Sequence, residues 1–490
     1  MMSDKKKVII LGGGLAGLAA AIILVEREFH VTIIERKPFL GGRASSFPII
    51  SDNASQKNVL TENSQSSLKD HRDKGLFIDN CQHILLNCCT NLLDFYRRIG
   101  VEKYIRFADH YLFQNFQGNK GVIKGSRLPA PFHLLPSFLR FKCLSWKDRL
   151  TVIYGFFCMF FEQSNLNRLD QVTMLNWLRT HGQSVQAIEV FWRTFLVSAL
   201  NEDLEKASAK YGVRVCIEGL LKNSNAFQMG LPIVPLEKLY TQPCLKFLRE
   251  RGAEIRLRSK VNRIEIIDSK VSGIKLNDGT EMVADYYLSS LPPEALLSVF
   301  DEDTVNESRY LSKLRQFHFS PIISIYLWFD KPVTDLTYLA VSERKVQWIF
   351  NKTKKNHNSN SDNHLSVVIS ASREFLSLQK ADILKIVLKD LNKILPAVQG
   401  SQLLNSIVVK EPFATFSCCV GCDQIRLEQK SPLSNLSIAG DWTNTGWPPT
   451  MESAVRSSYC CAELILEAEG RSESLLKPDL PPNGISRWLL

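Results

Sequence analysis

Short apolar runs and polar breaks alternate near the start of the chain in an order that predicts a strand, a turn, a helix and a second strand. Residues 8–11 are apolar and are followed by the glycine-rich residues 12–17. A helix rich in Ala, Leu and Ile is predicted as far as about Arg27, and a second apolar run over residues 31–34 ends on Glu35. This order is typical of a dinucleotide-binding Rossmann unit.

The glycines of this turn have the spacing that binding of a pyrophosphate requires. Gly12 permits a tight turn, Gly14 lets a phosphate approach the backbone, and Gly17 lets the helix pack closely on the strand. The first amides of the helix, at Leu15 and Ala16, are predicted to face the phosphates because a helix N-terminus favours negative charge.

The acid at the end of the second strand predicts the kind of nucleotide. Glu35 can accept hydrogen bonds from both ribose hydroxyls, which argues against a 2′-phosphate, and Arg36 beside it is a further candidate cofactor residue. Residues 8–25 carry no charge and would also suit a signal peptide or a membrane span. The glycine spacing and the terminal acid favour the nucleotide interpretation.

The segment after the second strand indicates which dinucleotide cofactor is bound. Residues 38–44, which include Gly41, Gly42 and Arg43, resemble the glycine-doublet and arginine segment of the flavin amine oxidase and carotenoid desaturase superfamily. NAD dehydrogenases lack this segment, so the resemblance implies FAD, with Gly42 and Arg43 among the residues that bind it. The same resemblance implies that Val261 presents its backbone to the adenine.

Alternating and helical patterns predict further elements along the chain. Strands are predicted over residues 76–78, 254–257, 260–266, 271–276, 286–290, 322–329 and 367–370, and helices over residues 92–99, 173–221, 236–251 and 380–394. The three strands between residues 254 and 276 are predicted to form a small antiparallel sheet, with a hairpin turn at Asn277-Asp278-Gly279. The polar residues 51–75 and 351–364 are predicted to be a loop and a solvated insertion, with His357 and His364 at the surface.

A strand end and a helix start near the C-terminus predict the second half of the cofactor site. The apolar residues 436–439 end in Gly440 and Asp441, whose carboxylate can bind ribityl or pyrophosphate hydroxyls. A helix is predicted to begin at Thr450, Met451 and Glu452, where its free amides would point at an anionic flavin carbonyl. The alternative is an ordinary capped helix, which the pairing with the N-terminal glycine turn disfavours.

A dense polar cluster is the candidate reaction site. Asp79, Asn80, Cys81, Gln82 and His83 directly follow the strand predicted over residues 76–78. The alternative is that Asp79 or Asn80 only caps the helix that comes next.

An aromatic and basic region is the candidate membrane contact. Residues 150–161 are uncharged but too few to span a bilayer. Phe138, Leu139, Phe141 and Trp146 are predicted to dip into a lipid interface while the nearby basic residues meet anionic headgroups; these are Lys124, Arg127, Arg140, Lys142, Lys147 and Arg149. The alternative is a buried helix beside an apolar substrate tunnel.

Composition and charge are those of a globular protein with an anionic partner surface. The 490 residues are 45% hydrophobic and 22% charged, which excludes a disordered or collagenous chain and predicts two or three domains. The formal net charge is +10, and because no nucleic-acid-binding motif accompanies it, a membrane surface is the predicted partner and nucleic acid is not.

The cysteines predict a reducing compartment. The twelve cysteines include adjacent pairs and no disulfide framework, which favours a cytoplasmic enzyme on the inner face of the membrane. Cys419 and Cys422 have redox or zinc-pair spacing, but no second such pair exists, so ordinary thiols and no metal site are expected.

Together the motifs resemble the squalene-associated FAD-dependent desaturases, also described as hydroxysqualene dehydroxylases of squalene and hopanoid synthesis. The resemblance rests on residues 12–17, Gly41-Gly42-Arg43, residues 79–86, Leu128-Pro129-Ala130-Pro131, Gly440-Asp441-Trp442-Thr443 and residues 449–455. The chain departs from that family at Cys81, where members usually have glycine.

This resemblance implies an activity. The substrate would be an allylic C30 alcohol, hydroxysqualene, reduced to squalene with electrons from an external reductant. Asp79 would be the acid, His83 its orienting partner and Gln82 a further catalytic residue. Three rivals stay open: a carotenoid-type desaturase, a flavin amine oxidase, and a non-catalytic carrier of prenyl lipids like the Rab escort and GDP-dissociation-inhibitor proteins.

The resemblance also implies the architecture. An α/β fold is expected, with a Rossmann-like FAD-binding domain of the flavin amine oxidase type that is discontinuous in sequence, a mixed α+β substrate domain and a helical, membrane-contacting region. The FAD-binding domain would comprise residues 1–100, 231–300 and 416–470, the helical substrate region residues 101–230, the sheet part of the substrate domain residues 301–415, and the tail residues 471–490.

Overall fold

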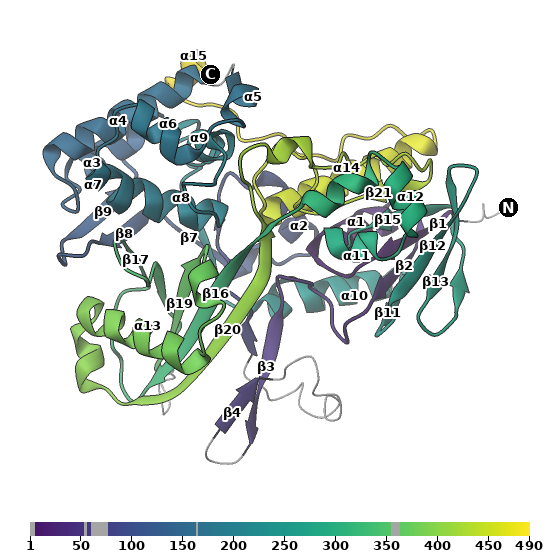
Figure 1. Ribbon diagram of the computed structural model, residues 1–490, viewed down its shortest axis with the longest axis horizontal. Coiled ribbons are helices and arrows are strands. Elements are labelled where there is room, and N and C mark those ends of the chain that lie inside the picture. The colour runs from purple at the N-terminus through teal and green to yellow at the C-terminus, as the bar shows by residue number, and fades with distance from the viewer. Residues whose placement is uncertain (1–4, 53–55, 60–76, 163–164, 354–362) are drawn as a thin grey trace.

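A five-stranded parallel sheet forms the centre of one part of the molecule (Figure 1). The computed structural model describes residues 5–52, 56–59, 77–162, 165–353 and 363–490. The sheet order is β11-β2-β1-β15-β21, and its strands are β1 (Lys7–Leu11), β2 (His30–Glu35), β11 (Glu254–Leu257), β15 (Tyr286–Ser289) and β21 (Leu436–Ile438). Segments that are distant in sequence thus become neighbours, and the predicted α/β arrangement is confirmed.

Helices cover this sheet. Helix α1 (Leu15–Glu26) packs against both α14 (Met451–Ala468) and α10 (Gln242–Glu250), while α2 (Thr90–Arg98) packs against α14. Every residue of α1 from Leu15 to Val25 is buried, which explains why this helix is apolar on all sides. A short helical segment, η6 (Glu237–Thr241), leads directly into α10.

The small antiparallel sheet differs from the prediction in one strand. β12 (Val261–Ile267), β13 (Lys270–Leu276) and β14 (Glu281–Met282) form it, with the predicted turn between β13 and β14. β11 was expected in the same sheet, but it runs parallel to β2 at the edge of the large sheet. Alternation of side chains cannot distinguish the two placements, because both leave one face of the strand partly exposed.

A seven-stranded sheet forms the second part of the molecule. Its order is β20-β16-β19-β18-β17-β8-β9, from β8 (His110–Gln114), β9 (Lys120–Lys124), β16 (Phe319–Phe329), β17 (Tyr338–Val341), β18 (Trp348–Asn351), β19 (Asn363–Ser370) and β20 (Leu403–Phe416). Helix α13 (Lys380–Ile394) packs on one face through a separate apolar core. β8 and β9 lie within residues 101–230, which were predicted as a helical region, so that prediction is wrong for these strands.

The prediction that His364 lies at the surface is also wrong. His364 is buried in β19, opposite Trp328 of β16, and its ring stacks on the Trp328 ring with centroids 4.3 Å apart. The end of the predicted solvated insertion is therefore a core strand. His357 lies outside the described residues.

A group of helices lies at the end of the molecule that also holds the C-terminal residues (Figure 1). They are α3 (Leu135–Leu139), α4 (Trp146–Phe161), α5 (Leu166–Leu169), α6 (Met174–Thr180), α7 (Val185–Ala187), η4 (Ile188–Trp192), α8 (Arg193–Leu200), α9 (Ala209–Cys216) and η5 (Ile217–Leu221). The predicted helical pattern over residues 173–221 is confirmed. Among the described residues, no helix combines the length and the apolar content that crossing a bilayer requires.

The polar stretch over residues 51–75 is not a loop throughout. Its first residues continue β3 (Ser46–Asp52), which pairs with β4 (Gln56–Val59) and with β5 (Phe77–Asp79), and residues 53–55 and 60–75 lie outside the described residues. The remaining elements are η1 (Glu102–Tyr104), β6 (Leu85–Leu86), β7 (Ile105–Ala108), η2 (Phe132–Leu134), β10 (Met229–Pro232), α11 (Pro293–Leu297), α12 (Glu302–Glu307), η7 (Leu311–Gln316), η8 (Arg373–Phe375), η9 (Pro396–Gly400), η10 (Cys422–Gln424) and α15 (Ser486–Leu489).

Candidate active site

The glycine turn between β1 and α1 has the geometry that its spacing predicts. Gly12 has a φ of +102°, and its N–H donates to the carbonyl of Ile34 over 2.8 Å. A Cβ on Gly17 would lie 2.1 Å from the carbonyl oxygen of Gly12, so only glycine lets α1 pack this closely on the turn. Gly14 directly precedes the helix, where the first amides have no acceptor within the helix.

Glu35 lies directly beneath this turn. It is buried, and its two carboxylate oxygens accept N–H groups of Gly13 at 2.7 Å and of Lys37 at 2.8 Å. A carboxylate has about four lone-pair sites, so each oxygen can still accept a hydroxyl. This arrangement fits the predicted contact with a ribose.

The other two residues predicted near the adenosine lie close to Glu35 in the fold. The N–H of Ser259 donates to the carbonyl of Glu35 over 3.0 Å, and Val261 begins β12 two residues further along. Val261 is buried and Arg36 is exposed at the end of β2. Their contacts with the cofactor stay predictions.

The glycine doublet meets the glycine turn through bare backbone. Gly41 donates its N–H to the carbonyl of Gly13 over 2.8 Å, and Gly14 and Gly41 form a parallel bridge. A Cβ on Gly42 would lie 2.9 Å from the Cα of Gly14. Because no side chain fits between these segments, they form a narrow backbone surface suited to a pyrophosphate.

Arg43 and Asp441 join the two halves of the predicted cofactor site. The Arg43 guanidinium forms an ion pair with the buried Asp441 carboxylate, and its Nη1 also donates to the carbonyl of Ala414 over 3.4 Å. Gly440 has a φ of +148°, and its N–H donates to Ser457 Oγ of α14 over 2.9 Å. The end of β21 is thus fixed to both the doublet and the last long helix.

Arg426 supports this strand end and was not predicted from the sequence. Its buried guanidinium donates to the carbonyl of Trp447 over 2.8 Å, to the carbonyl of Asp441 over 3.1 Å, and to the carbonyl of Thr443. It also donates to the hydroxyl of Tyr211 in α9. Nothing in the local pattern distinguishes Arg426 from a surface arginine, because its partners come from elsewhere in the chain.

Helix α14 starts where the sequence predicts, but its first residues also have capping roles that were given only as the alternative. Thr450 is the N-cap, and its hydroxyl accepts the N–H of Ser453 over 3.3 Å, while Met451 is partly exposed at the first helical position. The Glu452 side chain is fully buried and accepts the N–H groups of Asn91 at 3.2 Å and Leu92 at 2.8 Å. The prediction that Glu452 binds the cofactor is corrected for its side chain, which caps α2.

Asp79 lies at the end of β5, against the segment that follows the doublet. Its Oδ1 accepts the hydroxyl of Ser46 at 2.7 Å and the N–H of Leu236 at 2.9 Å, and its carbonyl accepts the Tyr326 hydroxyl at 2.5 Å. Burial raises the pKa of the Asp79 carboxyl, although these two hydrogen bonds and the charge of Lys352 lower it. Asp79 is therefore both a structural acceptor and an acid that retains its proton more readily than usual.

His83 and Asn80 extend this group toward Arg43. His83 Nε2 lies 3.2 Å from Asn80 Oδ1, and the Asn80 amide donates to the carbonyl of Arg43. Burial, and then the charge of Lys352, lower the pKa of His83 to about 4, so the ring is neutral near pH 7. Gln82 is buried and donates to the carbonyl of His83 over 3.1 Å.

Cys81 is accommodated without backbone strain. It is not among the non-glycine residues with positive φ, so this position does not require the glycine usual in the resembled family. Its buried thiol has its pKa raised to about 12 by burial, and it remains protonated.

Lys352 is the functional candidate that sequence analysis missed, because it lies within the residues predicted to be solvated. It follows β18, and its N–H donates to the carbonyl of His364 over 2.8 Å. Burial lowers the pKa of Lys352, while the charges of Asp79 and Cys81 raise it. Lys352, Asp79 and His83 thus form one group of ionisable side chains, and the apolar strand that ends at Asn351 was the only sequence signal for it.

A group of possible metal ligands lies elsewhere. Side-chain atoms of Asp170, Cys422 and Asp423 lie within 4.8 Å of one another. Asp423 is already bound by Lys210 and Tyr211, and burial raises the pKa of the Cys422 thiol well above its ordinary value. A protonated thiol beside a paired carboxylate is a poor ligand set, so this group carries no metal assignment.

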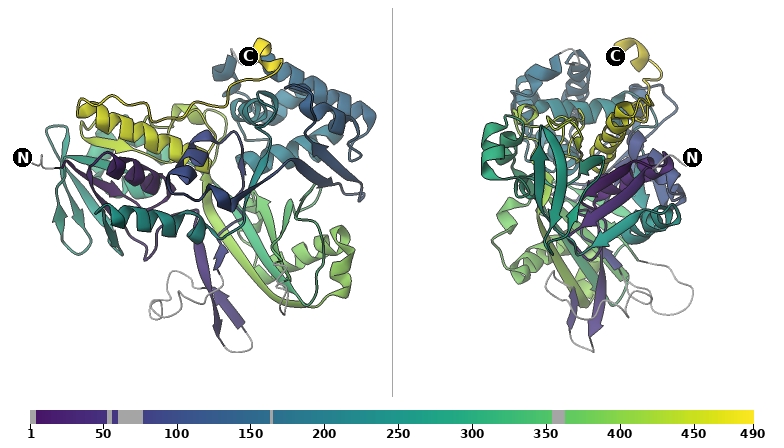
Figure 2. Two further views of the ribbon diagram at one scale, coloured as in Figure 1. Left: turned by 180° about the vertical axis from the view of Figure 1, so that it is seen from behind. Right: turned by 90° about the vertical axis from the view of Figure 1, so that its right-hand side faces the viewer.

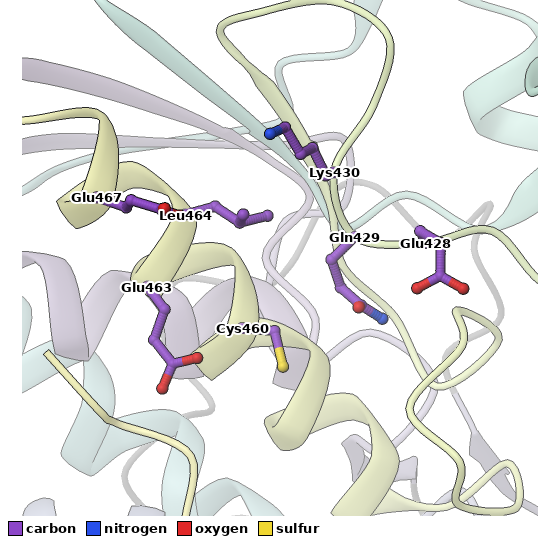
Figure 3. A pocket seen from close by; sticks show the side chains of 7 residues that line it. All are labelled: Glu428, Gln429, Lys430, Cys460, Glu463, Leu464 and Glu467. Atoms are coloured by element: carbon purple, nitrogen blue, oxygen red, sulfur yellow. The ribbon is translucent and has the colours of Figure 1, made fainter. Parts of the chain in front are cut away.

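The hollow in Figure 3 does not belong to the candidate active site. It is lined by Glu428, Gln429, Lys430, Cys460, Glu463, Leu464 and Glu467. The helix α14 residues in that list lie on the face opposite to Ser458, whose hydroxyl donates to the carbonyl of Ala16 over 2.7 Å. The Glu463 carboxylate accepts the N–H groups of Leu475 and Leu476, so the residues after α14 run back beside this helix.

These residues fit the FAD that the sequence resemblance implies. Bare backbone at Gly12, Gly14 and Gly42 suits the pyrophosphate, the Glu35 carboxylate suits the ribose, and Asp441 lies at the opposite end of the same sheet edge. The carboxyl ends of adjacent parallel strands are the usual place for a nucleotide.

Comparison with known families agrees with this fit. The model of the family described as flavin containing amine oxidoreductase matches residues 15–466. Among curated proteins, the 15-cis-phytoene desaturase of Capsicum annuum is 24% identical over 479 residues, which cover 94% of this chain and 78% of the relative. The 15-cis-phytoene desaturase of Synechococcus elongatus is 24% identical over 480 residues, which cover 94% of this chain and 96% of the relative.

Solved structures share the fold at low identity. A putrescine oxidase bound to putrescine superposes with a TM-score of 0.70 at 14% identity, covering 95% of this chain and 99% of that one. Cyclohexylamine oxidase from Brevibacterium oxydans superposes with a TM-score of 0.64 at 17% identity, covering 96% of this chain and 100% of that one.

Proposed function

Because the chain belongs to the flavin-containing amine oxidoreductase family and is thus an FAD-dependent oxidoreductase, we propose that it acts on a long isoprenoid, as a carotenoid-type desaturase does. The observation that carries this proposal is the similarity over 94% of the chain to the phytoene desaturases, which also covers most of each relative. The similarity to amine oxidases is to the fold alone.

The sheet face beside Asp79 supports an apolar substrate. Tyr326, Trp328 and Ile407 pack around Ile78, the residue before Asp79. Trp348 and Phe350 of β18 stack with ring centroids 5.7 Å apart. Aromatic side chains of this kind exclude water from a reacting carbon and give an isoprenoid chain an apolar surface.

FAD, when bound, supplies hydride transfer at its ring, and the protein supplies position and electrostatics. The residues that would hold it are those of the two glycine segments, Glu35 and Asp441. The Arg43–Asp441 pair fixes the doublet to β21, and Arg426 fixes the loop after β21. In a desaturase the substrate loses two hydrogens, and an external acceptor then takes the electrons from the enzyme.

A second candidate is the reductive removal of a hydroxyl group from an allylic alcohol such as hydroxysqualene. Asp79, His83 and Lys352 favour it, because a hydrocarbon needs no proton donor whereas a leaving hydroxyl does. The C–O bond breaks, the hydroxyl takes one proton and leaves as water, and a hydride replaces it at carbon. Two electrons from an external reductant balance this reaction. Asp79, with its raised pKa, is the proposed donor of the proton.

Single-turnover reactions distinguish these functions. Oxidised enzyme is mixed without oxygen with phytoene, squalene or putrescine, and reduced enzyme with hydroxysqualene, while flavin absorbance is followed and products are separated. Bleaching with phytoene and formation of a desaturated product would support the first proposal. Re-oxidation by hydroxysqualene with formation of squalene would support the second. Bleaching only by the amine, or bound lipid without any redox change, would contradict both.

A further inference from the structure

The outer face of α4 is an apolar stripe. Trp146, Leu150, Tyr154, Phe157 and Phe161 are all exposed, and the first and last are 64% and 65% exposed. Their spacing of three and four residues places them on one side of the helix. The opposite side, with Val152, Gly155 and Met159, is buried. Large apolar side chains in a continuous exposed stripe mark an interaction surface.

The residues before α4 extend the stripe. Leu128, Phe132 and Leu139 are exposed, and the Arg149 guanidinium donates to the carbonyls of Leu139 and Leu144, which fixes α3 against α4. The sequence had also predicted Phe138 and Phe141 at a lipid interface, and that is corrected because both are buried and stack on each other in the core.

Residues 485–490 add to this surface from a distant part of the chain. The N–H groups of Ile485 and Ser486 donate to the carbonyl of Ala130 over 2.8 and 3.1 Å, which ties α15 to the loop that carries Leu128 and Phe132. Trp488 is 89% exposed, and Leu489 and Leu490 are exposed beside it. Figures 1 and 2 show α15 at the same end of the molecule as the helices that include α4.

Basic side chains outnumber acidic ones around this surface, although Lys124 lies 3.8 Å from the carboxylate of the exposed Asp109. Lys124, Arg127, Arg140, Lys142, Lys147 and Arg487 are exposed. The acids on α4 and just after it are engaged: Asp148 accepts the hydroxyl of Ser184 at 2.6 Å, and Glu162 accepts the indole N–H of Trp177 at 3.2 Å. Cationic side chains around aromatic and aliphatic ones match the headgroups and the acyl boundary of an anionic bilayer.

From this juxtaposition we infer that the α4 stripe, Leu139 and residues 485–490 form one surface that binds anionic phospholipid bilayers. Tryptophan suits the boundary because its ring is apolar and its N–H is polar. An apolar protein partner would not require the surrounding positive charge. The inference does not depend on which isoprenoid the enzyme uses.

Co-sedimentation of the full chain with vesicles tests this surface. Vesicles of phosphatidylcholine alone are compared with vesicles that also contain phosphatidylglycerol, and three variants are compared with the wild type: L150E/F157E, K142E/K147E and W488A. The matched control is I267E/V283E. It changes Ile267, which ends β12 and is 63% exposed, and Val283, which follows β14 and is 70% exposed. Flavin content and melting temperature show that each variant is folded.

The expected result is binding to the anionic vesicles that falls at least ten-fold in L150E/F157E and K142E/K147E, falls measurably in W488A, and stays unchanged in the control. Bromine-labelled lipids should quench wild-type tryptophan fluorescence, and W488A should lose part of that quenching. Unchanged binding of the first two variants would overturn the inference. So would wild-type self-association that these substitutions abolish, without vesicle binding. If an α4 variant does not fold, W488A and the quenching of the wild type decide the question.

Discussion

The Arg43 guanidinium forms an ion pair with the Asp441 carboxylate, which joins the segment after β2 to the end of β21. The two residues are far apart in the sequence, and each directly follows a glycine, Gly42 or Gly440. The carbonyl of Arg43 also accepts a hydrogen bond from the Asn80 side-chain amide. Arg43 therefore connects the predicted cofactor segments with the Asp79–His83 segment.

Glu35→Ala should weaken FAD binding. The substitution removes a buried charged acceptor, which costs about 1.5 to 3 kcal/mol or roughly ten- to a hundred-fold in the dissociation constant. Titration of the apoprotein with FAD, followed by flavin fluorescence, measures it. Glu28→Gln, at an exposed position beyond α1, is the control. Equal affinity of Glu35→Ala and wild type would remove the ribose assignment.

Asp79→Asn and Lys352→Met should separate chemistry from cofactor binding. Both should retain the flavin spectrum. If the second candidate function holds, the rate of re-oxidation of reduced enzyme by hydroxysqualene should fall by about 10²- to 10⁴-fold in Asp79→Asn, as for loss of a general acid. Lys352→Met should shift the pH dependence of this rate to higher pH, because the charge of Lys352 lowers the pKa of Asp79.

Lys345→Met, which removes an exposed ion pair with Glu374 near the same sheet, is the control for Lys352→Met. Wild-type rates in both site variants would show that Asp79 is only a structural hydrogen-bond acceptor for Ser46 and Leu236. Loss of flavin from both would make the segment structural.

Arg426→Met should destabilise the protein and release flavin. It leaves the carbonyls of Thr443 and Trp447 without this donor in a buried loop, and each unsatisfied group costs about 1 to 3 kcal/mol, whereas the Asp441 carbonyl still accepts the Ser453 hydroxyl. Urea unfolding and flavin content measure both effects. Arg315→Met, whose exposed guanidinium pairs with Glu302, should change neither. A stable Arg426→Met protein with full flavin would show that the loop after β21 keeps its conformation without this guanidinium.

His133 should make the protein less stable in mild acid. Burial lowers the pKa of His133 to about 4, and within the described residues neither ring nitrogen has a hydrogen-bond partner. An unfolded chain binds a proton on this residue below its ordinary pKa of 6.5, whereas the folded protein does not until about pH 4. Stability is therefore fully present above pH 6.5 and falls between pH 6.5 and 4, by about 1.4 kcal/mol for each pH unit.

His133→Phe tests this assignment. The variant should lose less stability than the wild type when urea unfolding is measured at pH 7.5, 6.0 and 5.0. His83, whose pKa is also lowered to about 4, should leave part of the dependence in place. His30→Gln, at an exposed position, should follow the wild-type curve. Parallel curves for His133→Phe and wild type would show that the ring is protonated in the folded protein.

Local pattern predicted the parts of the site that are built from local backbone. The glycine turn, Glu35 at the end of a strand and the helix start at Thr450 follow from residue types at fixed spacing, and the structure has each of these elements where it was expected. Other features depend on pairing between distant segments. β11 joins β2 rather than β12, and Glu452 turns to α2, because contacts with other elements decide between arrangements that the sequence pattern leaves equal.

Lys352 and Arg426 show the same limit for individual side chains. A lysine within a polar stretch and an arginine in a loop look solvated in sequence, since their partners Asp79 and Asp441 lie on other elements. Only the tertiary arrangement gives these cations their surroundings. The apolar strand before Lys352 indicates a buried position, whereas the polar residues after it indicate an exposed one, and the local sequence does not decide between them.

The parallel sheet also fixes when during biosynthesis this protein can take up its cofactor. β21 is the last strand to emerge from the ribosome, and it pairs with β15, while α1 needs α14 as its neighbour. Non-local pairings of this kind form late and slowly. Until residues 436–468 have left the ribosome, the nascent chain has one half of a binding site and exposes the apolar sides of α1. Flavin insertion is therefore a step that follows synthesis of residues 436–468.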